Sequence, residues 1–300
     1  MLHGWIILDK PAGLGSTQAV AVVKRILREI GEPKTKVGHG GTLDPLASGV
    51  LPIALGEATK LCGRLLDASK GYEFTIAFGE ETDTLDAEGK TVATSAVRPT
   101  PEQIEAVLPR FTGEIEQIPP AYSALKVEGK PAYARARAGE ALEMKVRHVT
   151  VRELSIRHPR DGENDSLAQV TLSAEVSKGT YIRSLARDIA HALGTVGHVS
   201  YLRRTRAGPF SLATAISLDF LGEAAKARAL TRTVLPLTAA LDDILALPVT
   251  SRQAEMLRQG QRLAGFPAPP GLSLATSEGT PVALVEASAD GLRVVRGFNL

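Results

Sequence analysis

The sequence predicts an α+β protein in which helices flank a mixed, mostly antiparallel sheet, with a small β-rich unit at the C-terminal end. Segments of helical and strand periodicity alternate without the regular strand–helix–strand order of a parallel sheet. The 300 residues contain 44% hydrophobic and 23% charged residues, which is typical of a protein with an ordinary folded core. After Leu247, glycines and prolines separate short apolar runs, which favours strands joined by turns.

The N-terminal part of the chain has clear apolar periods. In residues 16–30 the apolar positions recur every three or four residues, which predicts a helix capped by Ser16 or Thr17. From Tyr72 to Phe78 apolar and polar residues alternate, which predicts a half-buried strand. The predicted elements in this part are a strand at 4–9, a helix at 16–30, a loop at 31–41, a helix at 57–69 and a strand at 72–78.

The remaining elements follow by the same criteria. They are a helix at 101–109, strands at 146–156 and 167–176, a helix from Gly179-Thr180 to about 193, and strands at 282–285 and 292–295. Helical patterning fades after Pro236-Leu237. We therefore divide the chain into a large domain, residues 1–246, and a small β-rich one, residues 247–300.

The composition excludes several classes of protein. The single cysteine, Cys62, cannot form an intramolecular disulfide, and no cysteine cluster offers a zinc or iron–sulfur site. The N-terminal apolar run is short and lacks a preceding basic region, and no stretch reaches the about 18 apolar residues of a membrane helix. We expect a cytoplasmic protein with no membrane span, no metal ion and no cofactor.

Positive charge is concentrated in the middle of the chain. Residues 121–208 hold fifteen lysines and arginines against nine acidic residues, although the net charge of the whole chain is only +2. Such a segment suits a surface that binds a polyanion, because lysine and arginine near phosphates release condensed counterions. A solvated basic face without a ligand would have the same composition, so charge alone leaves both interpretations open.

The segment GHGGTLDPLASG, residues 38–49, is the densest candidate for chemistry. Its glycines allow tight turns and close approach of a ligand, and Pro45 moves the backbone of Asp44 out of the helical region. A stiff loop would then present the Asp44 carboxylate. Asp followed by Pro is also a common pair at the start of a helix, and these residues alone favour that N-cap interpretation. A phosphate-binding loop is disfavoured because no Gly-Lys-Ser/Thr follows.

Two further side chains are candidates for a role in binding or catalysis. Arg183 lies on the opening turn of a predicted helix, where a guanidinium forms a forked pair with a carboxylate or a phosphate. Its next-turn neighbour Arg187 would either face RNA or pair locally near Asp188. Tyr72, taken alone, is more typical of a core residue than of a site.

The acidic loop TDTLDAEG, residues 82–89, invites comparison with a calcium-binding loop. Its spacing fails the EF-hand pattern, and we reject a dedicated metal site there. The carboxylates of Asp83 and Asp86 would either orient an arginine or be solvated.

Taken together, five segments resemble, in order, those of the TruB family of tRNA pseudouridine synthases, which isomerise the T-loop uridine at position 55. The longest is GHGGTLDPLASGVLPIALGEATK at 38–60, which looks like the signature of that family. The other four are LDKPAG at 8–13, KGYEF at 70–74, PPAYSALK at 119–126 with Tyr133, and GTYIR at 179–183 followed by HVSYLRR at 198–204. The resemblance spans roughly residues 4–210.

The resemblance implies a pseudouridine synthase fold for residues 1–246 and a small PUA-like RNA-binding domain for residues 247–300. It also implies that tRNA, bound by its T-arm, is the partner, with no obligate protein partner. The glycines and cations of residues 122–152 suit a mobile RNA-binding insertion in the larger domain.

The same resemblance assigns the site residues. Asp44 matches the catalytic aspartate, which replaces the N-cap interpretation. Arg183 matches the arginine that pairs with this aspartate. Tyr72 matches the tyrosine that stacks on the target base, and it is also a candidate for the proton-transfer step. The positions that match substrate contacts of the family are His39, Lys60, Tyr72, Tyr181 and Leu202. One departure is Gly40, where many members carry threonine or alanine.

The chemistry accounts for these residue types. The glycosidic bond is cut at N1 and remade at C5, so the uracil must detach, rotate and stay captive. A carboxylate either adds covalently to the nucleoside or assists proton removal from the sugar, and the sequence leaves both routes open. Because the uridine is stacked within folded RNA, it must be flipped into a pocket, where an aromatic face replaces the lost stacking.

Two other functions fit the same residues. The chain could be a synthase of this family that acts on another RNA, with guide-RNA partners, although its compact C-terminal segment argues against that. It could also be a non-catalytic RNA-binding or RNA-folding protein, which the basic segment would suit equally. Loss of turnover without loss of RNA binding, on replacing Asp44, separates an enzyme from a binder.

Overall fold

A mixed sheet forms the centre of the larger part of the molecule. The computed structural model describes residues 1–32, 34–123, 125–140, 142–157 and 167–300. The strands up to residue 211 are β1 (Gly4–Lys10), β2 (Val37–His39), β3 (Ser48–Leu55), β4 (Lys70–Phe78), β5 (Glu80–Thr82), β6 (Thr91–Thr94), β7 (Gly113–Gln117), β8 (Lys126–Val127), β9 (Lys130–Pro131), β10 (Arg147–Ile156), β11 (Gln169–Val176), β12 (Gly197–Ala207) and β13 (Phe210–Ser211).

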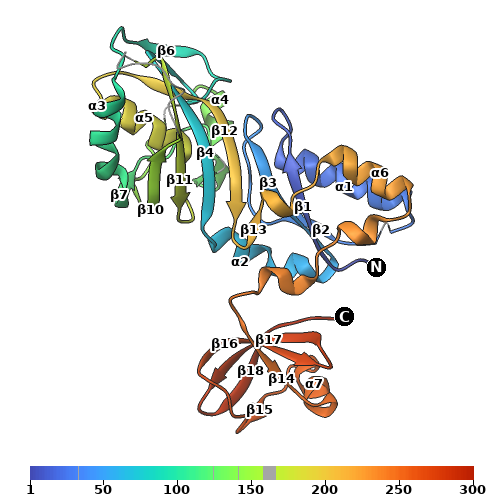
Figure 1. Ribbon diagram of the computed structural model, residues 1–300. Helices are drawn as coiled ribbons and strands as arrows, with labels where there is room; N and C mark the ends of the chain where they lie inside the picture. Colours follow the sequence, from blue (N-terminus) through green and yellow to red (C-terminus); the bar gives the residue numbers. More distant parts are fainter. Residues whose placement is uncertain (33, 124, 141, 158–166) are drawn as a thin grey trace.

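The order of strands in this sheet is β1-β3-β12-β4-β11-β10-β7, with β2 paired to β3 and β13 to β12 (Figure 1). The β12–β3 pairing is parallel, and the other pairings in this sheet are antiparallel. The α+β class with a mostly antiparallel sheet is therefore confirmed. Because β12 joins the two halves of the sheet, residues from both halves meet beside it.

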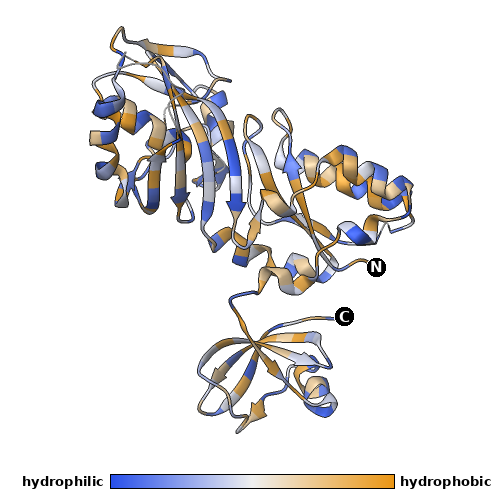
Figure 2. Ribbon diagram, viewed as in Figure 1, coloured by the Kyte–Doolittle hydropathy of each residue, from blue (hydrophilic) through white to orange (hydrophobic). Residues whose placement is uncertain are grey.

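Helices cover the sheet at both ends. The helices are α1 (Ser16–Glu29), α2 (Cys62–Asp67), α3 (Pro101–Val107), α4 (Ala132–Arg137), α5 (Ile182–Ala192), α6 (Leu218–Lys226) and α7 (Ser251–Arg258). In Figure 1, α1 and α6 lie side by side next to β1, and α3 and α5 lie at the opposite end. Hydrophobic and hydrophilic residues alternate along these helices and strands, so each presents an apolar side to the core (Figure 2).

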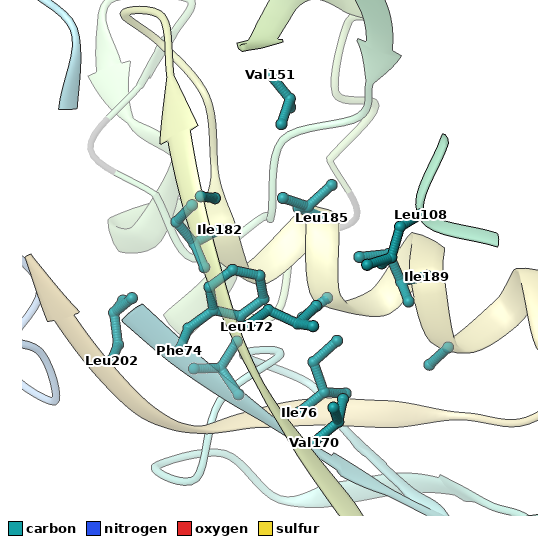
Figure 3. Packing of buried hydrophobic residues seen from close by; sticks show 14 of the residues in the cluster. Phe74, Ile76, Leu108, Val151, Val170, Leu172, Ile182, Leu185, Ile189 and Leu202 are labelled. Atoms are coloured by element: carbon teal, nitrogen blue, oxygen red, sulfur yellow. The ribbon is translucent and has the colours of Figure 1, made fainter. Parts of the chain in front are cut away.

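The core around α5 positions one wall of the site described below. Figure 3 shows Phe74 and Leu172 from the sheet beside Ile182 and Leu185 of α5. All four side chains are buried. A second cluster, which includes Ile6, Val23 and Leu51, packs α1 and α6 against β1 and β3. Burial of such apolar surface, at roughly 25 cal/mol per Å², is the main term that fixes the sheet relative to α5.

The C-terminal residues form a second sheet of five strands. Their order is β14-β16-β17-β18-β15, and α7 packs against β16, β17 and β18. The bounds are β14 (Leu245–Pro248), β15 (Leu263–Ala264), β16 (Gly271–Ser277), β17 (Thr280–Ser288) and β18 (Gly291–Gly297). This unit has its own buried cluster, and Leu274, Leu284 and Phe298 also join a cluster with Trp5 and Phe210 of the larger part.

Most predicted elements are found within a few residues of their expected bounds, including the strands after Leu247. The helix predicted at 57–69 is a 3₁₀ turn, η1 (Gly56–Leu61), followed by α2. Two details were wrong. The loop predicted at 31–41 contains the short strand β2, because these residues pair with β3. Helix α1 begins after Gly15 rather than after Ser16 or Thr17, and the Gln18 side chain accepts the Gly15 N–H at 2.7 Å.

The insertion predicted at 122–152 has a small structure of its own. Strands β8 and β9 form a hairpin, and α4 follows directly.

Within the described ranges, every helix of the chain is too short or too polar to cross a lipid bilayer.

Gly49 is the position where the parallel β12–β3 pairing leaves no space for a side chain. Its φ is +102°, and a Cβ added there would lie 2.2 Å from the carbonyl oxygen of Arg204. We predict that Gly49→Ala lowers the free energy of unfolding by about 2 kcal/mol or more. Urea denaturation followed by circular dichroism measures this change.

Gly63→Ala is the matched control. Gly63 lies in α2 with no heavy atom within 4 Å of an added Cβ, so alanine should leave stability unchanged or raise it by about 0.5–1 kcal/mol. Equal stability of the two variants would contradict this account of the pairing.

Candidate functional site

Asp44 lies in a loop that joins β2 to β3. The backbone turns at Asp44, whose carbonyl oxygen accepts a hydrogen bond from the Ala47 N–H at 3.1 Å. No helix follows Asp44, because β3 begins at Ser48 to pair with β1, so the N-cap interpretation is wrong. The Asp44 side chain is 38% exposed, and its carboxylate is therefore accessible to a ligand.

Buried polar side chains on three elements, α1, β12 and β1, hold the backbone of this loop in place. The Ser16 hydroxyl of α1 lies 2.8 Å from both the backbone N and the backbone O of Leu43. The Arg204 guanidinium of β12 donates to the carbonyl oxygens of Val50 (2.7 Å), Thr42 (3.1 Å) and Gly41 (3.2 Å). These bonds satisfy the backbone groups of a glycine-rich segment that would otherwise be free to change conformation.

Lys10 of β1 contacts the backbone of Pro45, the loop residue that follows Asp44. Its fully buried ammonium donates to the carbonyl oxygens of Pro11 (2.9 Å) and Leu14 (2.6 Å) and reaches that of Pro45 at 3.4 Å. Burial, together with the nearby Arg204 cation, lowers the pKa of Lys10 to about 8, although the Asp44 carboxylate opposes this shift.

Arg183, on the first turn of α5, connects two carboxylates. Its Nη2 lies 2.9 Å from Asp44 Oδ2, and its Nη1 lies 3.1 Å from Asp86 Oδ2. The same two nitrogens donate to the carbonyl oxygens of Thr84 (2.9 Å) and Tyr122 (3.1 Å). The Arg183 side chain is only 7% exposed, so these contacts replace its lost hydration.

The carboxylate of Asp44 borders a cavity of ≈ 180 Å³. Tyr72 lies on β4, and Leu202 lies on the neighbouring strand β12. Tyr181 occupies the N-cap position of α5. The cavity is lined by Thr42, Leu43, Asp44, Tyr72, Ser123, Thr180, Tyr181, Ile182, Arg183 and Leu202. Five of the predicted site residues, Asp44, Tyr72, Tyr181, Arg183 and Leu202, are thus brought together around one small space.

Tyr181 is held from its backbone. Its N–H donates to Gln117 Oε1 at 3.1 Å, and its carbonyl oxygen accepts from Gln117 Nε2 at 3.4 Å. Burial raises the pKa of the Tyr181 hydroxyl, so this group stays protonated at neutral pH and can donate a hydrogen bond.

Two of the predicted residues lie outside this cavity. His39 borders a separate hollow of ≈ 790 Å³ beside α1, whose lining includes Lys24 and Arg28. Burial and the nearby Arg204 lower the pKa of His39, which favours the neutral ring at pH 7. The ammonium of Lys60 is taken by Glu57 Oε2 at 2.6 Å and by the Gly297 carbonyl oxygen at 2.9 Å, at the contact with the C-terminal unit.

Asp86 is a site residue that the sequence analysis named together with Asp83 without separating the two. It is 3% exposed, and its Oδ1 accepts from the Thr84 hydroxyl (2.6 Å) and the Glu88 N–H (3.1 Å). Of the two roles considered for the acidic loop, orienting an arginine is the one that Asp86 has. Asp83, by contrast, accepts from the Lys90 N–H on an exposed turn. The spacing of the loop gave no signal to separate the two aspartates.

The basic stretch 121–208 is less uniformly accessible than its charge suggests. Arg183 and Arg204 are buried, and several others form ion pairs, including Arg203 with Asp9 and Arg206 with Glu175. His158 and Arg160 lie outside the described residues. Among the described cations of this stretch, those that are exposed and have no ion-pair partner are Lys126, Lys130, Arg137, Lys145, Arg147 and Arg152.

Comparison with known families finds two adjacent matches, which together include every residue that lines the cavity. Residues 24–182 match the model of the TruB family pseudouridylate synthase (N terminal domain), and residues 183–242 match that of the tRNA pseudouridylate synthase B C-terminal domain. Three curated relatives, each called tRNA pseudouridine synthase B, align over nearly the full chain. The one from Zymomonas mobilis is 60% identical (99% of this chain, 96% of the relative), that from Novosphingobium aromaticivorans 59% (100% and 98%), and that from Caulobacter vibrioides 48% (100% and 97%).

Two solved structures are similar in fold over almost the entire chain. The "Structure of H/ACA RNP bound to a substrate RNA containing 2'-deoxyuridine" aligns with a TM-score of 0.74 and 26% identity, covering 99% of this chain and 86% of that chain. The "Crystal Structure of a Cbf5-Nop10-Gar1 Complex" aligns with a TM-score of 0.73 and 28% identity, covering 99% and 84%.

The pairing of Asp86 with Arg183 gives a stability prediction. Asp86→Asn should lower the free energy of unfolding by about 3 kcal/mol, because the buried Arg183 guanidinium then keeps only one carboxylate partner. Thermal and urea unfolding of the purified variant measure the change.

Asp83→Asn, in the same loop, is the control and should change stability by less than about 0.5 kcal/mol. If both variants are as stable as the wild type, Arg183 does not depend on Asp86.

Proposed function

The chain belongs to the TruB family of pseudouridylate synthases, and on that premise we propose that it converts uridine to pseudouridine at position 55 in the T-loop of tRNA. The observation that carries the proposal is the Asp44 carboxylate, paired with Arg183 at 2.9 Å, beside a small cavity walled by Tyr72, Tyr181 and Leu202. A carboxylate, an aromatic face and an apolar wall suit the capture of one flipped base.

In the proposed reaction, Asp44 acts on the nucleoside while the uracil leaves. The N1–C1′ bond breaks and a C5–C1′ bond forms; the proton on C5 is lost, and N1 ends protonated, so the reaction is an isomerisation without a redox change. The carboxylate serves either as a nucleophile or as a base for a sugar proton. In both routes Arg183 holds the carboxylate toward the cavity, and its buried position excludes water from that side.

Tyr72 and Leu202 have complementary proposed roles. Tyr72 is half-buried on β4, and we propose that its ring stacks on the flipped uracil and its hydroxyl takes part in moving the proton. Leu202 and Tyr181 close the cavity around the base. The cavity of ≈ 180 Å³ is small, so the detached uracil has little room to leave before it is rejoined.

The wider RNA surface is proposed from charge. The six exposed cations between Lys126 and Arg152 that have no ion-pair partner among the described residues lie in the insertion, and Tyr122 at its start contacts Arg183. We propose that this insertion closes over the T-arm and holds its phosphates. His39 would contact RNA beside the flipped nucleotide. Lys60 we leave out of the proposed contacts, because Glu57 and the Gly297 carbonyl already use its ammonium.

We further propose that residues 1–246 form the catalytic domain and residues 247–300 a PUA-like RNA-binding domain. The enzyme would work in the cytoplasm without an obligate protein partner.

Mapping of pseudouridine in an unmodified tRNA transcript tests the proposed reaction. The wild type should convert the single T-loop uridine without added cofactor, and Asp44→Asn should slow conversion at least about 100-fold while tRNA affinity stays within about threefold. Asp67→Asn removes a more exposed carboxylate that pairs with Lys178 on the surface, and this control should keep full activity.

Conversion by Asp44→Asn at the wild-type rate would refute the role of Asp44. If the wild type binds tRNA but converts none of it, the target is another RNA or the protein is a non-catalytic binder.

Limited proteolysis tests closure of the insertion. Trypsin should cleave free protein after Lys126, Arg137 or Lys145, and saturating tRNA should slow this cleavage about tenfold or more, because bound phosphates cover these side chains. Cleavage after the exposed Lys226 at the end of α6 should be unchanged. Equal protection at all sites, or none in the insertion, would contradict the proposed closure.

A further inference from the structure

Ser123 lines the same cavity as Asp44. Its backbone is fixed on both sides: its N–H donates to the Ala121 carbonyl oxygen at 3.0 Å, and its carbonyl oxygen accepts from the Tyr133 N–H at 3.0 Å. The preceding carbonyl, that of Tyr122, accepts from Arg183 Nη2. Ser123 therefore follows directly on a residue whose carbonyl oxygen is bound by the guanidinium that pairs with Asp44.

The Ser123 hydroxyl has no hydrogen-bond partner among the described residues. The residue is 4% exposed, and its Oγ is closed off from solvent. A contact with the Ser123 hydroxyl lowers the pKa of Tyr181 against the larger effect of burial, yet the two hydroxyls do not form a hydrogen bond of normal geometry. A buried hydroxyl without a partner is costly, and Ser123 is one of the residues that line the cavity.

Two other polar side chains around the cavity, those of Arg183 and Thr180, are already engaged. The terminal nitrogens of Arg183 bind two carboxylates and two carbonyl oxygens, and the Thr180 hydroxyl donates to the Ser177 carbonyl oxygen at 3.0 Å. A uracil that enters brings two carbonyl acceptors and one N–H donor, and each loses its hydration. Ser123 Oγ is a donor that remains available for one of the carbonyls.

We infer that the Ser123 hydroxyl donates a hydrogen bond to a carbonyl oxygen of the flipped uracil and holds the base while it is detached. This inference rests on the proposed function. The reaction itself adds a reason. For C5 to replace N1 at C1′, the ring turns about the axis through N3 and C6, and this turn exchanges the positions of the O2 and O4 carbonyls. One hydroxyl at a fixed place can therefore bind O2 or O4 before rotation and the other oxygen afterwards.

The first test compares Ser123→Ala with Ser184→Ala. The Ser184 hydroxyl of α5 is also buried, but it donates to the Ile118 carbonyl oxygen at 2.8 Å and does not line the cavity. Under single-turnover conditions with saturating enzyme, Ser123→Ala should convert the tRNA uridine about tenfold more slowly. Its melting temperature should equal or exceed that of the wild type, because it removes an unsatisfied group. Ser184→Ala should melt at a lower temperature and keep its rate within about twofold.

The second test asks which partner the hydroxyl binds. A tRNA with 2-thiouridine or 4-thiouridine at the target carries a sulfur that accepts hydrogen bonds poorly. Each thio-substitution should slow the wild type more than it slows Ser123→Ala, because the variant has already lost the bond to that atom. A 2′-deoxyuridine target changes the sugar instead, and it should slow both proteins by the same factor.

The outcomes separate this inference from the proposed function. If the wild type makes no pseudouridine, the proposed function fails and the comparison of serines is not reached. If the wild type is active and Ser123→Ala keeps its full rate, or if Ser123→Ala loses stability as Ser184→Ala does, the inference is overturned. Sensitivity to thio-substitution that is identical in wild type and Ser123→Ala also overturns it. Should Ser123→Ala fail to fold, Ser123→Cys, which keeps the volume but donates weakly, replaces it in both tests.

Discussion

The buried guanidinium of Arg183 is the interaction on which the site depends. A cation removed from water needs partners, and here those of Arg183 on α5 come from three segments far apart in sequence: the Asp44 loop, the acidic loop with Thr84 and Asp86, and the start of the insertion at Tyr122. Removing one partner leaves charge or a donor uncompensated in the interior. The position of Arg183 therefore depends on all of these segments at once, and each segment is held in place by its contact with the same guanidinium.

Backbone geometry supports this arrangement on both sides of Arg183. Leu85 has φ = +62°, an unusual value for a non-glycine residue, and the flanking backbone forms a bridge with Val199 of β12. This turn directs the Asp86 carboxylate inward. On the other side, Arg204 and Ser16 bind the backbone of the Asp44 loop. Costly local conformations and buried charges are thus concentrated around the one carboxylate that faces the cavity.

Much of this could be predicted from the sequence, because the relevant signals are local. The periodicity of residues 16–30 and the alternation after Tyr72 are properties of single segments, and both elements are present. The long motif around Asp44 and the short one ending at Arg183 identified two partners of the central ion pair. Periodicity predicted the strand that carries Tyr72 and the helix that begins near Tyr181, whereas no strand was predicted at 197–207, so Leu202 entered the site only through the resemblance to the family.

The remaining features depend on contacts between distant segments. Asp83 and Asp86 have the same side chain and similar neighbours in sequence, and only the packing of their loop on β12 sets Asp86 against Arg183. Ser16 looked like a helix cap but binds the Asp44 loop, because Leu43 folds against α1. Lys60 belongs to a strong motif, yet the C-terminal residues that occupy it lie more than 200 positions away. No sequence pattern predicts that the Ser123 hydroxyl lacks a hydrogen-bond partner among the described residues, because this depends on where distant polar groups lie in the fold.

A double-mutant cycle on the single-turnover rate of uridine conversion tests the central role of Arg183 most directly. Arg183→Lys keeps the charge but cannot bridge both carboxylates, and Asp86→Asn removes one of them. Because both changes break the same contact, the account predicts that the double variant converts tRNA at nearly the rate of the slower single variant. Losses that multiply would show that Asp86 and Arg183 act independently, and would contradict the account.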